Sequence, residues 1–167
     1  EREGTTGNPH AELPDGGVAL AQLTGGQALV QSLKKHGVDT MFVLPGVQLD
    51  NTFDALYDEK DAITLYHTRH EQATSYMADG YARTTGKPGV CLVVPGPGLL
   101  NAMAGLSTAY ACSAPVLAIS GQINSDLIGK GRGMLHEIPD QIVAVRSVTK
   151  WAERIDRPED ASKLVQE

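Results

Sequence analysis

Hydrophobic and polar positions alternate along this chain with two different periods. Apolar residues at helical spacing predict four helices, over residues 27–36, 48–59, 68–86 and 98–113. Short apolar runs between them predict four buried strands, over residues 39–46, 62–68, 89–94 and 114–121. Strands that alternate with helices favour a parallel sheet covered on both faces. We therefore expect a doubly wound α/β fold with a mainly parallel sheet.

The pattern weakens toward both ends of the chain. Residues 121–137 contain four glycines and no hydrophobic period, which predicts a long loop. Beyond it we expect a short helix over 138–149, a weak strand over 150–155 and the start of a helix over 157–167. Residues 1–24 are rich in Gly and Thr and include two Pro, and they are expected to form a flexible lead-in, so that 25–167 make up the domain.

Two of the predicted helices carry more apolar surface than their own domain needs. The helix over 98–113 is apolar almost all round. The helix over 68–86 has one stripe with Tyr76 and Met77 and a second stripe of small residues, Ser75, Ala78 and Ala82. Its Gly80 costs roughly 1 kcal/mol relative to Ala, which the close approach of another backbone would explain. We infer a partner surface; the alternative is that the two helices simply pack on each other.

Composition narrows the kinds of partner. The net charge is −6, which argues against a nucleic acid or an anionic membrane. No apolar run approaches the roughly 18 residues of a membrane helix, and no secretory signal is visible. Cys91 and Cys112 lie in apolar surroundings without a CxxC spacing, so we interpret both as reduced core residues of a cytoplasmic protein.

Candidate chemistry gathers where the predicted strands end. Ligands of such sheets bind at the carboxyl ends of the strands. Those ends are Pro45-Gly46, Thr68 to Glu71, Pro95 to Gly98, and Gly121-Gln122. Glu71 also stands in the first turn of a helix, where the helix dipole alone is worth roughly 0.3–1 kcal/mol to a carboxylate. The residues alone leave two readings open: a charge placed well for the helix, or an acid in a cleft that holds or passes a proton.

The stretch PGPGLLN is open to two interpretations as well. A glycine-rich turn before a helix can bind phosphate, but Pro95 and Pro97 remove backbone donors, and neither GxGxxG nor GK[ST] occurs here. A rigid wall beside a flat organic ring, with Asn101 offering an amide, fits the residues better than a phosphate loop does. A purely structural tight turn before a buried helix fits them as well as the wall does.

Other site chemistries find little support. The histidines His67, His70 and His136 lack HExxH spacing and an accompanying set of acidic ligands, so we expect no metal site in this chain. No GxSxG elbow marks a hydrolase.

Three long motifs occur in the order and at the spacing of a known family. They read RHEQATSYMADGYARTTGKPGV, PGPGLLNAMAGLSTAYACSAPVLAISGQ and IPDQIVAVRSVTKWA. Through them the chain, from about Leu23 to its C-terminus, closely resembles the N-terminal pyrimidine-binding domain of thiamine-diphosphate-dependent enzymes. The branch it resembles is the acetolactate-synthase-like group, which acts on 2-oxo acids by decarboxylation and carboligation.

The resemblance implies a role for Glu71. In the family, the glutamate of this motif hydrogen-bonds N1′ of the cofactor's aminopyrimidine and favours the imino tautomer. The imino nitrogen then removes the proton from C2 of the thiazolium. A carboxylate shielded from water suits this step, because a solvated one would bias the tautomer less.

The resemblance assigns further positions by their motifs. Cofactor-binding residues are expected to be Pro45, Gly46, Glu71, Pro97, Gly98 and Asn101. Substrate-side residues are expected to be Val47, Gln48, Gln122 and His136. Where the family often has Phe-Gln-Glu, this chain reads Leu-His-Glu within Met-Leu-His-Glu, which puts acetolactate synthesis itself in doubt. His136 is either a substrate contact or a solvated loop residue.

One element of the family is absent. A GDG…N motif on another domain holds the diphosphate and its Mg²⁺, and no GDG occurs in this sequence. The chain alone is therefore expected to be inactive and to pair with the diphosphate-binding domain of a neighbouring subunit in a homodimer or homotetramer. It is expected to be a fragment of a longer enzyme. Two alternatives are a separate subunit of a two-chain 2-oxo-acid decarboxylase and a non-catalytic α/β ligand-binding module.

Overall fold

The computed structural model describes residues 22–167 of this chain, so most of the expected lead-in lies outside the described residues. The strands are β1 (Thr40–Val43), β2 (Thr64–His67), β3 (Gly89–Val93) and β4 (Val116–Ser120). The helices are α1 (Gly25–Lys35), α2 (Asp50–Asp58), α3 (Glu71–Thr85), α4 (Pro97–Ala111), α5 (Gln141–Val145) and α6 (Ala161–Gln166). Short 3₁₀ turns are η1 (Val47–Leu49), η2 (Ser125–Leu127), η3 (Arg146–Val148) and η4 (Pro158–Asp160).

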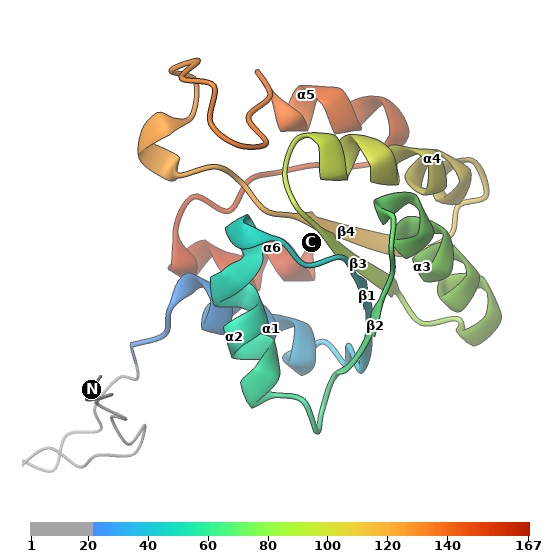
Figure 1. The fold of residues 1–167 in the computed structure, drawn as a ribbon. Helices are drawn as coiled ribbons and strands as arrows, with labels where there is room; N and C mark the ends of the chain where they lie inside the picture. The colour runs from blue at the N-terminus through green and yellow to red at the C-terminus, as the bar shows by residue number, and fades with distance from the viewer. Residues whose placement is uncertain (1–21) are drawn as a thin grey trace, which may run out of the picture.

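The strands form a parallel sheet in the order β2-β1-β3-β4, with helices on both faces (Figure 1). One face packs on α1, α2 and α6 through a cluster centred on Leu33, Met41 and Leu56. The other face packs on α3, α4 and α5 through a cluster that includes Cys91 and Leu106. The predicted doubly wound α/β fold is therefore confirmed.

Helix α3 begins and ends as its sequence predicts. The Nδ1 atom of His70 accepts a hydrogen bond from the backbone N–H of Gln72, which caps the first turn. Gly86 ends the helix with φ +73°, a left-handed conformation that glycine adopts without strain. These two signals place Glu71 at the first helical position, directly after the turn that leaves β2.

Several sequence-based expectations were wrong in detail. Residues 150–155 form no strand, and the helix expected over 138–149 is the shorter α5 followed by η3. The strand before Glu71 was expected to be buried, but β2 is an edge strand and three of its four residues are exposed. A short apolar run cannot show whether a strand will have neighbours on both sides.

The two cysteines differ from each other. Both are free thiols, but only Cys91 is buried, and burial raises the pKa of its thiol to about 12. Cys112 caps the end of α4 and is exposed, so its expected place in the core was wrong. Its neighbour in space is Arg83, whose guanidinium lies 3.8 Å from the Cys112 sulfur.

Helices α3 and α4 lie side by side at close range because small residues face each other. A Cβ atom built on Gly105 would overlap Ser75 and would lie 2.7 Å from the backbone nitrogen of Tyr76. The stripe of small residues on α3 is thus used inside the domain. Gly80 is exposed, and a Cβ atom there meets nothing within 4 Å among the described residues. The backbone approach that would explain Gly80 does not come from this part of the chain.

None of the helices within residues 22–167 is both long enough and apolar enough to cross a membrane.

A clamp of side chains ties the amino end of the sheet to α3. Asp39 accepts hydrogen bonds from the Tyr81 hydroxyl at 2.9 Å and from the Lys87 ammonium at 2.6 Å. These contacts lower the pKa of Asp39 from its ordinary 3.8 to about 2, with the Lys87 hydrogen bond as the largest cause. Asp39 is about half exposed, at 48 %, so solvent screening limits the free energy that this pair contributes.

The exposed Gly80 of α3 and the buried Gly105 of α4 offer a matched test. Gly105→Ala should lower the free energy of unfolding by about 1–3 kcal/mol, because the backbone of α3 cannot move away cheaply. Gly80→Ala should raise it by about 0.5–1 kcal/mol, because alanine is the better helix former and has room. Urea unfolding of both variants measures this. Equal effects of the same sign would contradict the packing described for α3 and α4.

The Asp39 clamp predicts a particular dependence of stability on pH. The folded-state pKa lies below the unfolded one, so the contribution is complete above about pH 4 and is lost as the pH falls toward about pH 2. Asp39→Asn should therefore unfold with a shallower loss of stability between those two pH values. Thermal unfolding of both proteins across that range measures the difference, and identical curves would show that the clamp is not formed in solution.

Candidate functional site

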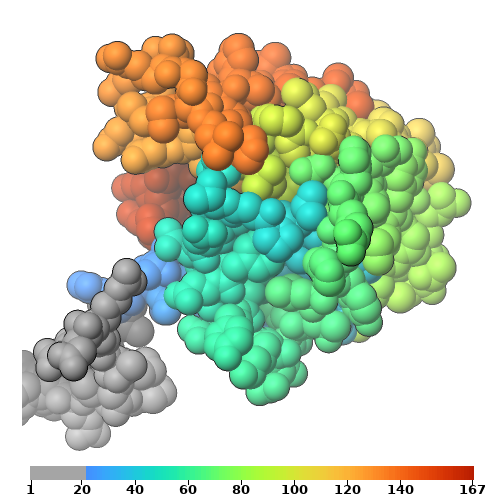
Figure 2. Space-filling view, viewed as in Figure 1, coloured from blue at the N-terminus to red at the C-terminus, as the bar shows by residue number. Residues whose placement is uncertain are grey.

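The candidate site lies at the carboxyl edge of the sheet, between β1 and β3. From β1 the chain continues to β2 on one side, whereas β3 and β4 lie on the other side, so the order of the sheet reverses at this point. In open α/β sheets, ligands bind at such switch points. The segments that meet here are the turn after β1, the turn after β3, and the loop after β4, which gather on the face shown in Figure 2.

Glu71 and Asn101 form the polar centre of this edge. The side-chain Nδ2 of Asn101 donates a hydrogen bond to Oε2 of Glu71 at 3.0 Å. Glu71 stands in the first turn of α3 and Asn101 in the first two turns of α4, so two helix starts present one carboxylate–amide pair. Glu71 is half-buried in this chain. Sequence analysis named both residues but could not place them in contact.

The buried side chain of Val94 forms the wall beside this pair. A Cβ atom built on Gly98 would lie 2.5 Å from Cγ2 of Val94 and 3.4 Å from Oε1 of Glu71, and one on Gly46 would overlap Cγ1 of the same valine. Both predicted glycines therefore fit around one isopropyl group. Val94 was missed by sequence analysis, because its role depends on contacts between segments that are far apart in the chain.

The turn after β3 offers a ligand almost no backbone donors. Pro95 and Pro97 have none. The N–H of Gly96 is taken by Oε1 of Gln141 at 2.9 Å, and the N–H of Gly98 points to the carbonyl of Pro95 at 3.3 Å. A phosphate cradle needs several free N–H groups that converge on one point. This geometry agrees with the interpretation of the turn as a rigid wall, with Pro97 exposed at its surface.

Gln48 and His136 form a second polar pair at the mouth of the site. Nε2 of Gln48 donates to the carbonyl of Leu135 at 3.0 Å, and Oε1 of Gln48 lies 2.9 Å from Nδ1 of His136. The carbonyl can only accept, which fixes the orientation of the amide, and an amide oxygen can only accept, so Nδ1 of His136 carries the proton. Nε2 of a neutral His136 then has a free lone pair.

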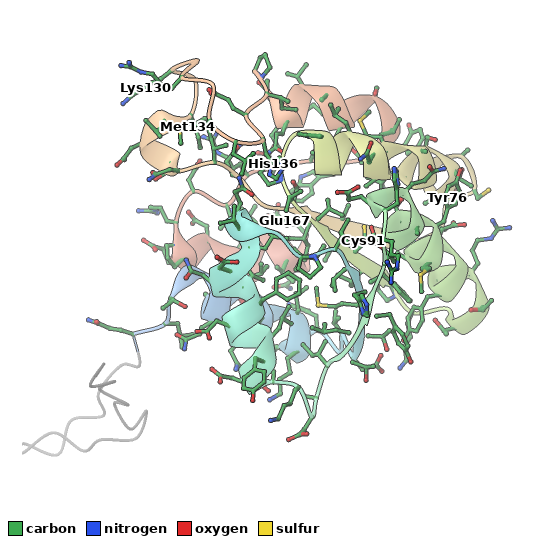
Figure 3. The ribbon with its side chains drawn as sticks, viewed as in Figure 1. Tyr76, Cys91, Lys130, Met134, His136 and Glu167 are labelled. Atoms are coloured by element: carbon green, nitrogen blue, oxygen red, sulfur yellow. The ribbon has the colours of Figure 1, made fainter. Side chains whose placement is uncertain are left out.

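Figure 3 shows where this loop lies. His136 sits close to the start of α4, whereas Lys130 and Met134 lie on the outer part of the loop and Tyr76 lies on the outer side of α3. The contact with the start of α4 is close, because a Cβ atom on Gly96 would overlap the carbonyl of His136. The loop over 121–138 thus packs against the wall.

The remaining expected site residues are less engaged. Val47 is exposed at 59 %, and Pro45 is exposed beside it. Gln122 is half-buried, and its Oε1 accepts a hydrogen bond from its neighbour Ile123. The structure therefore brings Gln48 and His136 together but leaves Gln122 in a local contact.

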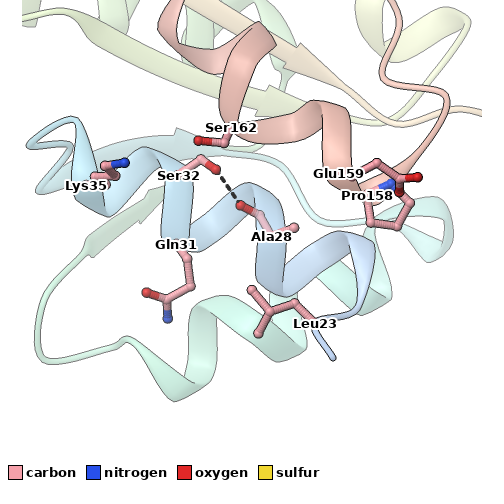
Figure 4. A pocket seen from close by; sticks show the side chains of 8 residues that line it. All are labelled: Leu23, Ala28, Gln31, Ser32, Lys35, Pro158, Glu159 and Ser162. Carbon is pink, nitrogen blue, oxygen red and sulfur yellow. Dashed lines mark hydrogen bonds between the residues drawn. The ribbon is translucent and has the colours of Figure 1, made fainter. Parts of the chain in front are cut away.

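Two hollows are found on the surface, one far from the strand ends and one beside the start of α3. One, of about 480 Å³, lies between α1 and the C-terminal segment (Figure 4). Its lining residues are Leu23, Ala28, Gln31, Ser32, Lys35, Pro158, Glu159 and Ser162. The hydroxyl of Ser32 is already bonded to the carbonyl of Ala28 within α1. The other hollow, of about 470 Å³, lies on the outer side of α3 and includes His70, Tyr76 and Met77. Across residues 22–167, no three His, Cys, Asp or Glu side chains gather as a metal would require.

The fold is an α/β domain, and the Glu71–Asn101 pair at its switch point is a candidate ligand site. The chain matches the family described as "Thiamine pyrophosphate enzyme, N-terminal TPP binding domain" over residues 23–144. This match spans well over half of the chain, so the protein belongs to the N-terminal domain family of the thiamine pyrophosphate enzymes.

Individual relatives point the same way. A probable 2-ketoarginine decarboxylase of Pseudomonas aeruginosa is 44 % identical over 143 residues, which is 86 % of this chain and 25 % of the relative. An acetolactate synthase of Arthrospira platensis is 47 % identical over 113 residues, 66 % of this chain and 20 % of that protein. A probable acetolactate synthase large subunit of Methanocaldococcus jannaschii is 40 % identical over 83 % of this chain and 22 % of its own length. The chain spans about a quarter or less of these relatives.

The wall around Val94 can be tested by a double-mutant cycle. Gly98→Ala should destabilise the domain by about 1–3 kcal/mol, because its methyl group meets the branched side chain of Val94. In a Val94→Ala background the same change should cost clearly less, because the obstructing methyl groups are gone. Urea unfolding of the four proteins measures the coupling. Strictly additive free energies would show that Gly98 does not pack on Val94.

Proposed function

We propose that this chain is the pyrimidine-binding domain of a thiamine-diphosphate-dependent enzyme that acts on a 2-oxo acid, in an acetolactate-synthase-like decarboxylation or carboligation. The observation that carries the proposal is the Asn101–Glu71 pair at the switch point, against a glycine-lined apolar wall. Family membership supports the use of thiamine diphosphate. The names of the relatives, decarboxylase and acetolactate synthase, support the substrate class.

The residues present fit the pyrimidine half of the cofactor better than its diphosphate half. An aminopyrimidine is flat and needs an apolar surface with one carboxyl group at its edge. Because Gly98 and Gly46 have no side chains, the surface around Val94 is not obstructed, and Glu71 lies beside it. The backbone donors that a diphosphate would need are already paired in the turn after β3. We therefore infer that Pro45, Gly46, Pro97, Gly98 and Asn101 hold the ring.

Glu71 is proposed to hold the proton that the ring's N1′ atom shares. Asn101 donates to one carboxylate oxygen, Oε2, which orients the carboxyl group so that its other oxygen, Oε1, is offered beside Gly98. A carboxyl group fixed in this way, and shielded from water, can pass its proton repeatedly without reorienting. When bound, thiamine diphosphate supplies the carbon nucleophile that adds to the carbonyl of a 2-oxo acid.

Four residues are proposed to face the substrate. Val47 offers an exposed apolar surface directly after β1. Gln48 and His136 form a hydrogen-bonded pair. In a neutral His136 the Nε2 atom then has a lone pair that can accept a hydrogen bond. Gln122 follows β4 and would have to release its contact with Ile123 before it could reach a substrate.

A neighbouring subunit is proposed to complete the site. It would contribute a domain that binds the diphosphate and Mg²⁺, within a homodimer or homotetramer. The exposed apolar side chains on and beside α3 and α4 support this inference, since Tyr66, Tyr76, Met77 and Leu100 are each between 40 and 51 % exposed. The hollow on α3 lies on the same surface. Two free thiols support a cytoplasmic location.

The proposal predicts the effect of one substitution. In the complete enzyme, Glu71→Gln should slow proton exchange at C2 of the bound cofactor by about 10²–10⁴-fold, because an amide cannot pass the proton that a carboxyl group holds. The enzyme, saturated with cofactor, is mixed with deuterated water, the exchange is quenched at set times, and the remaining C2 proton is measured by NMR.

Glu153→Gln is the control, because it removes an equal charge from an exposed position outside the site, where Glu153 lies 3.7 Å from Arg146. An unchanged exchange rate in Glu71→Gln, with the cofactor bound, would remove Glu71 from the mechanism.

A further inference from the structure

One buried side chain at the strand-end edge has no part in the proposed chemistry. Gln141 is the first residue of α5 and is only 8 % exposed. Its Oε1 accepts a hydrogen bond from the N–H of Gly96 at 2.9 Å, and its Nε2 donates one to the carbonyl of Gly121 at 3.1 Å. The hydroxyl of Ser120 lies 3.4 Å from the same Oε1. One amide therefore joins the turn after β3 to the end of β4.

The turn needs this partner. Gly96 has φ +57° and ψ −115°, a conformation that a side chain would strain, and its position is buried. Between two prolines, its N–H is the single backbone donor of residues 95–97. Among the described residues, no side chain caps the start of α4. Without Gln141, the N–H would be buried and unpaired, which is unfavourable because the group would lose water without gaining a partner.

The position of the turn decides the position of the site. Gly96 is the residue from which α4 starts, so a shift of Gly96 carries Gly98 and Asn101 with it. Asn101 reaches Glu71 at 3.0 Å, a distance that a shift of half an ångström would turn into a poor hydrogen bond. Gln141 comes 45 residues after Gly96 in the sequence, so only the fold brings the two together.

We propose that Gln141 is a positioning residue of the site: it anchors the turn at 95–98 to the end of β4 and so holds Asn101 within reach of Glu71. This inference rests on the proposed function only in naming Glu71 as the group that is positioned. The anchoring contacts themselves require no cofactor. Both polar atoms of the Gln141 amide are used in the anchor, so we assign Gln141 no direct contact with ring or substrate.

The chemistry of the anchor suggests a substitution whose effect on the two hydrogen bonds depends on pH. The anchor requires one acceptor for Gly96 and one donor for Gly121 within the same side chain. A protonated glutamic acid has the same shape and offers both. An ionised one keeps the acceptor but sets a negative oxygen against the carbonyl of Gly121. Burial raises the pKa of such a carboxyl group, so the protonated form should persist at mildly acid pH.

Gln141→Glu in the full 167-residue chain is the experiment. At about pH 5 the exchange rate of the Gly96 amide hydrogen and the NMR signals of the Asn101 side-chain amide should match those of the unsubstituted chain. At about pH 8 the Gly96 amide hydrogen should exchange about tenfold faster, relative to the unsubstituted chain at the same pH, and the Asn101 signals should move.

Gln141→Met separates anchoring from simple filling of space, because it keeps the volume and loses both hydrogen bonds. It should show the altered Gly96 and Asn101 signals at both pH values. Gln166→Glu introduces the same charge at an exposed position of α6 and is the control. Comparison with the unsubstituted chain at the same pH corrects for effects of pH that do not depend on position 141.

The outcomes decide the proposal. If Gln141→Glu matches the unsubstituted chain at both pH values, or if Gln141→Met leaves the Asn101 signals in place, Gln141 does not position the site. Should the Met variant fail to fold, the Glu variant alone decides. In the complete enzyme, C2 proton exchange of the bound cofactor should slow on passing from about pH 5 to about pH 8 in Gln141→Glu relative to Gln166→Glu. Altered NMR signals with unaltered C2 exchange would support the anchor and count against the role of Glu71.

Discussion

The close packing of α3 on α4 is the constraint on which the site depends. Ser75 and Gly105 touch at the middle of the two helices, and one helical turn earlier on each, Glu71 accepts the hydrogen bond of Asn101. Both pairs are separated by 30 residues in sequence, so the helices run in the same direction in a fixed register. A side chain at position 105 would push them apart and draw Asn101 away from the carboxylate. The absence of a side chain at Gly105 thus helps to set the distance between Glu71 and Asn101, one turn earlier on the two helices.

The turn after β3 shows how the same architecture serves different ligands. A strand followed by a glycine-rich turn and a helix start is the arrangement that binds phosphates in many proteins. Here two prolines remove donors, Gln141 occupies the N–H of Gly96, and the N–H of Gly98 turns back to Pro95. What remains is an apolar surface around Val94 with a carboxylate at its edge. The chemistry of the edge is decided by which backbone groups are already paired.

The sequence predicted the fold because its apolar periods follow the two sides of the sheet. Both core clusters lie mainly within the predicted helices and strands, as Leu33 and Leu106 do. The failures share a cause: they concern neighbours that periodicity cannot identify. Cys112 has an apolar sequence context but lies past the last turn of α4. Gln141 and Val94 were missed because their partners lie on other segments, and only the fold brings them together.

The exposure of Glu71 connects the proposed chemistry to the proposed partner. A carboxylate biases a bound ring most strongly when water is excluded from it. Within this chain Glu71 is half-buried, with Oε1 beside Gly98 and Oε2 bonded to Asn101. The apolar residues Tyr76, Met77 and Leu100 remain exposed on the same two helices. We infer that a subunit that covered those side chains and also reached the start of α3 would shield the carboxylate from water. We therefore infer that burial of the apolar surface and activation of Glu71 are one event. On this view the cost of desolvating the charge is offset by the apolar area that the same contact removes from water.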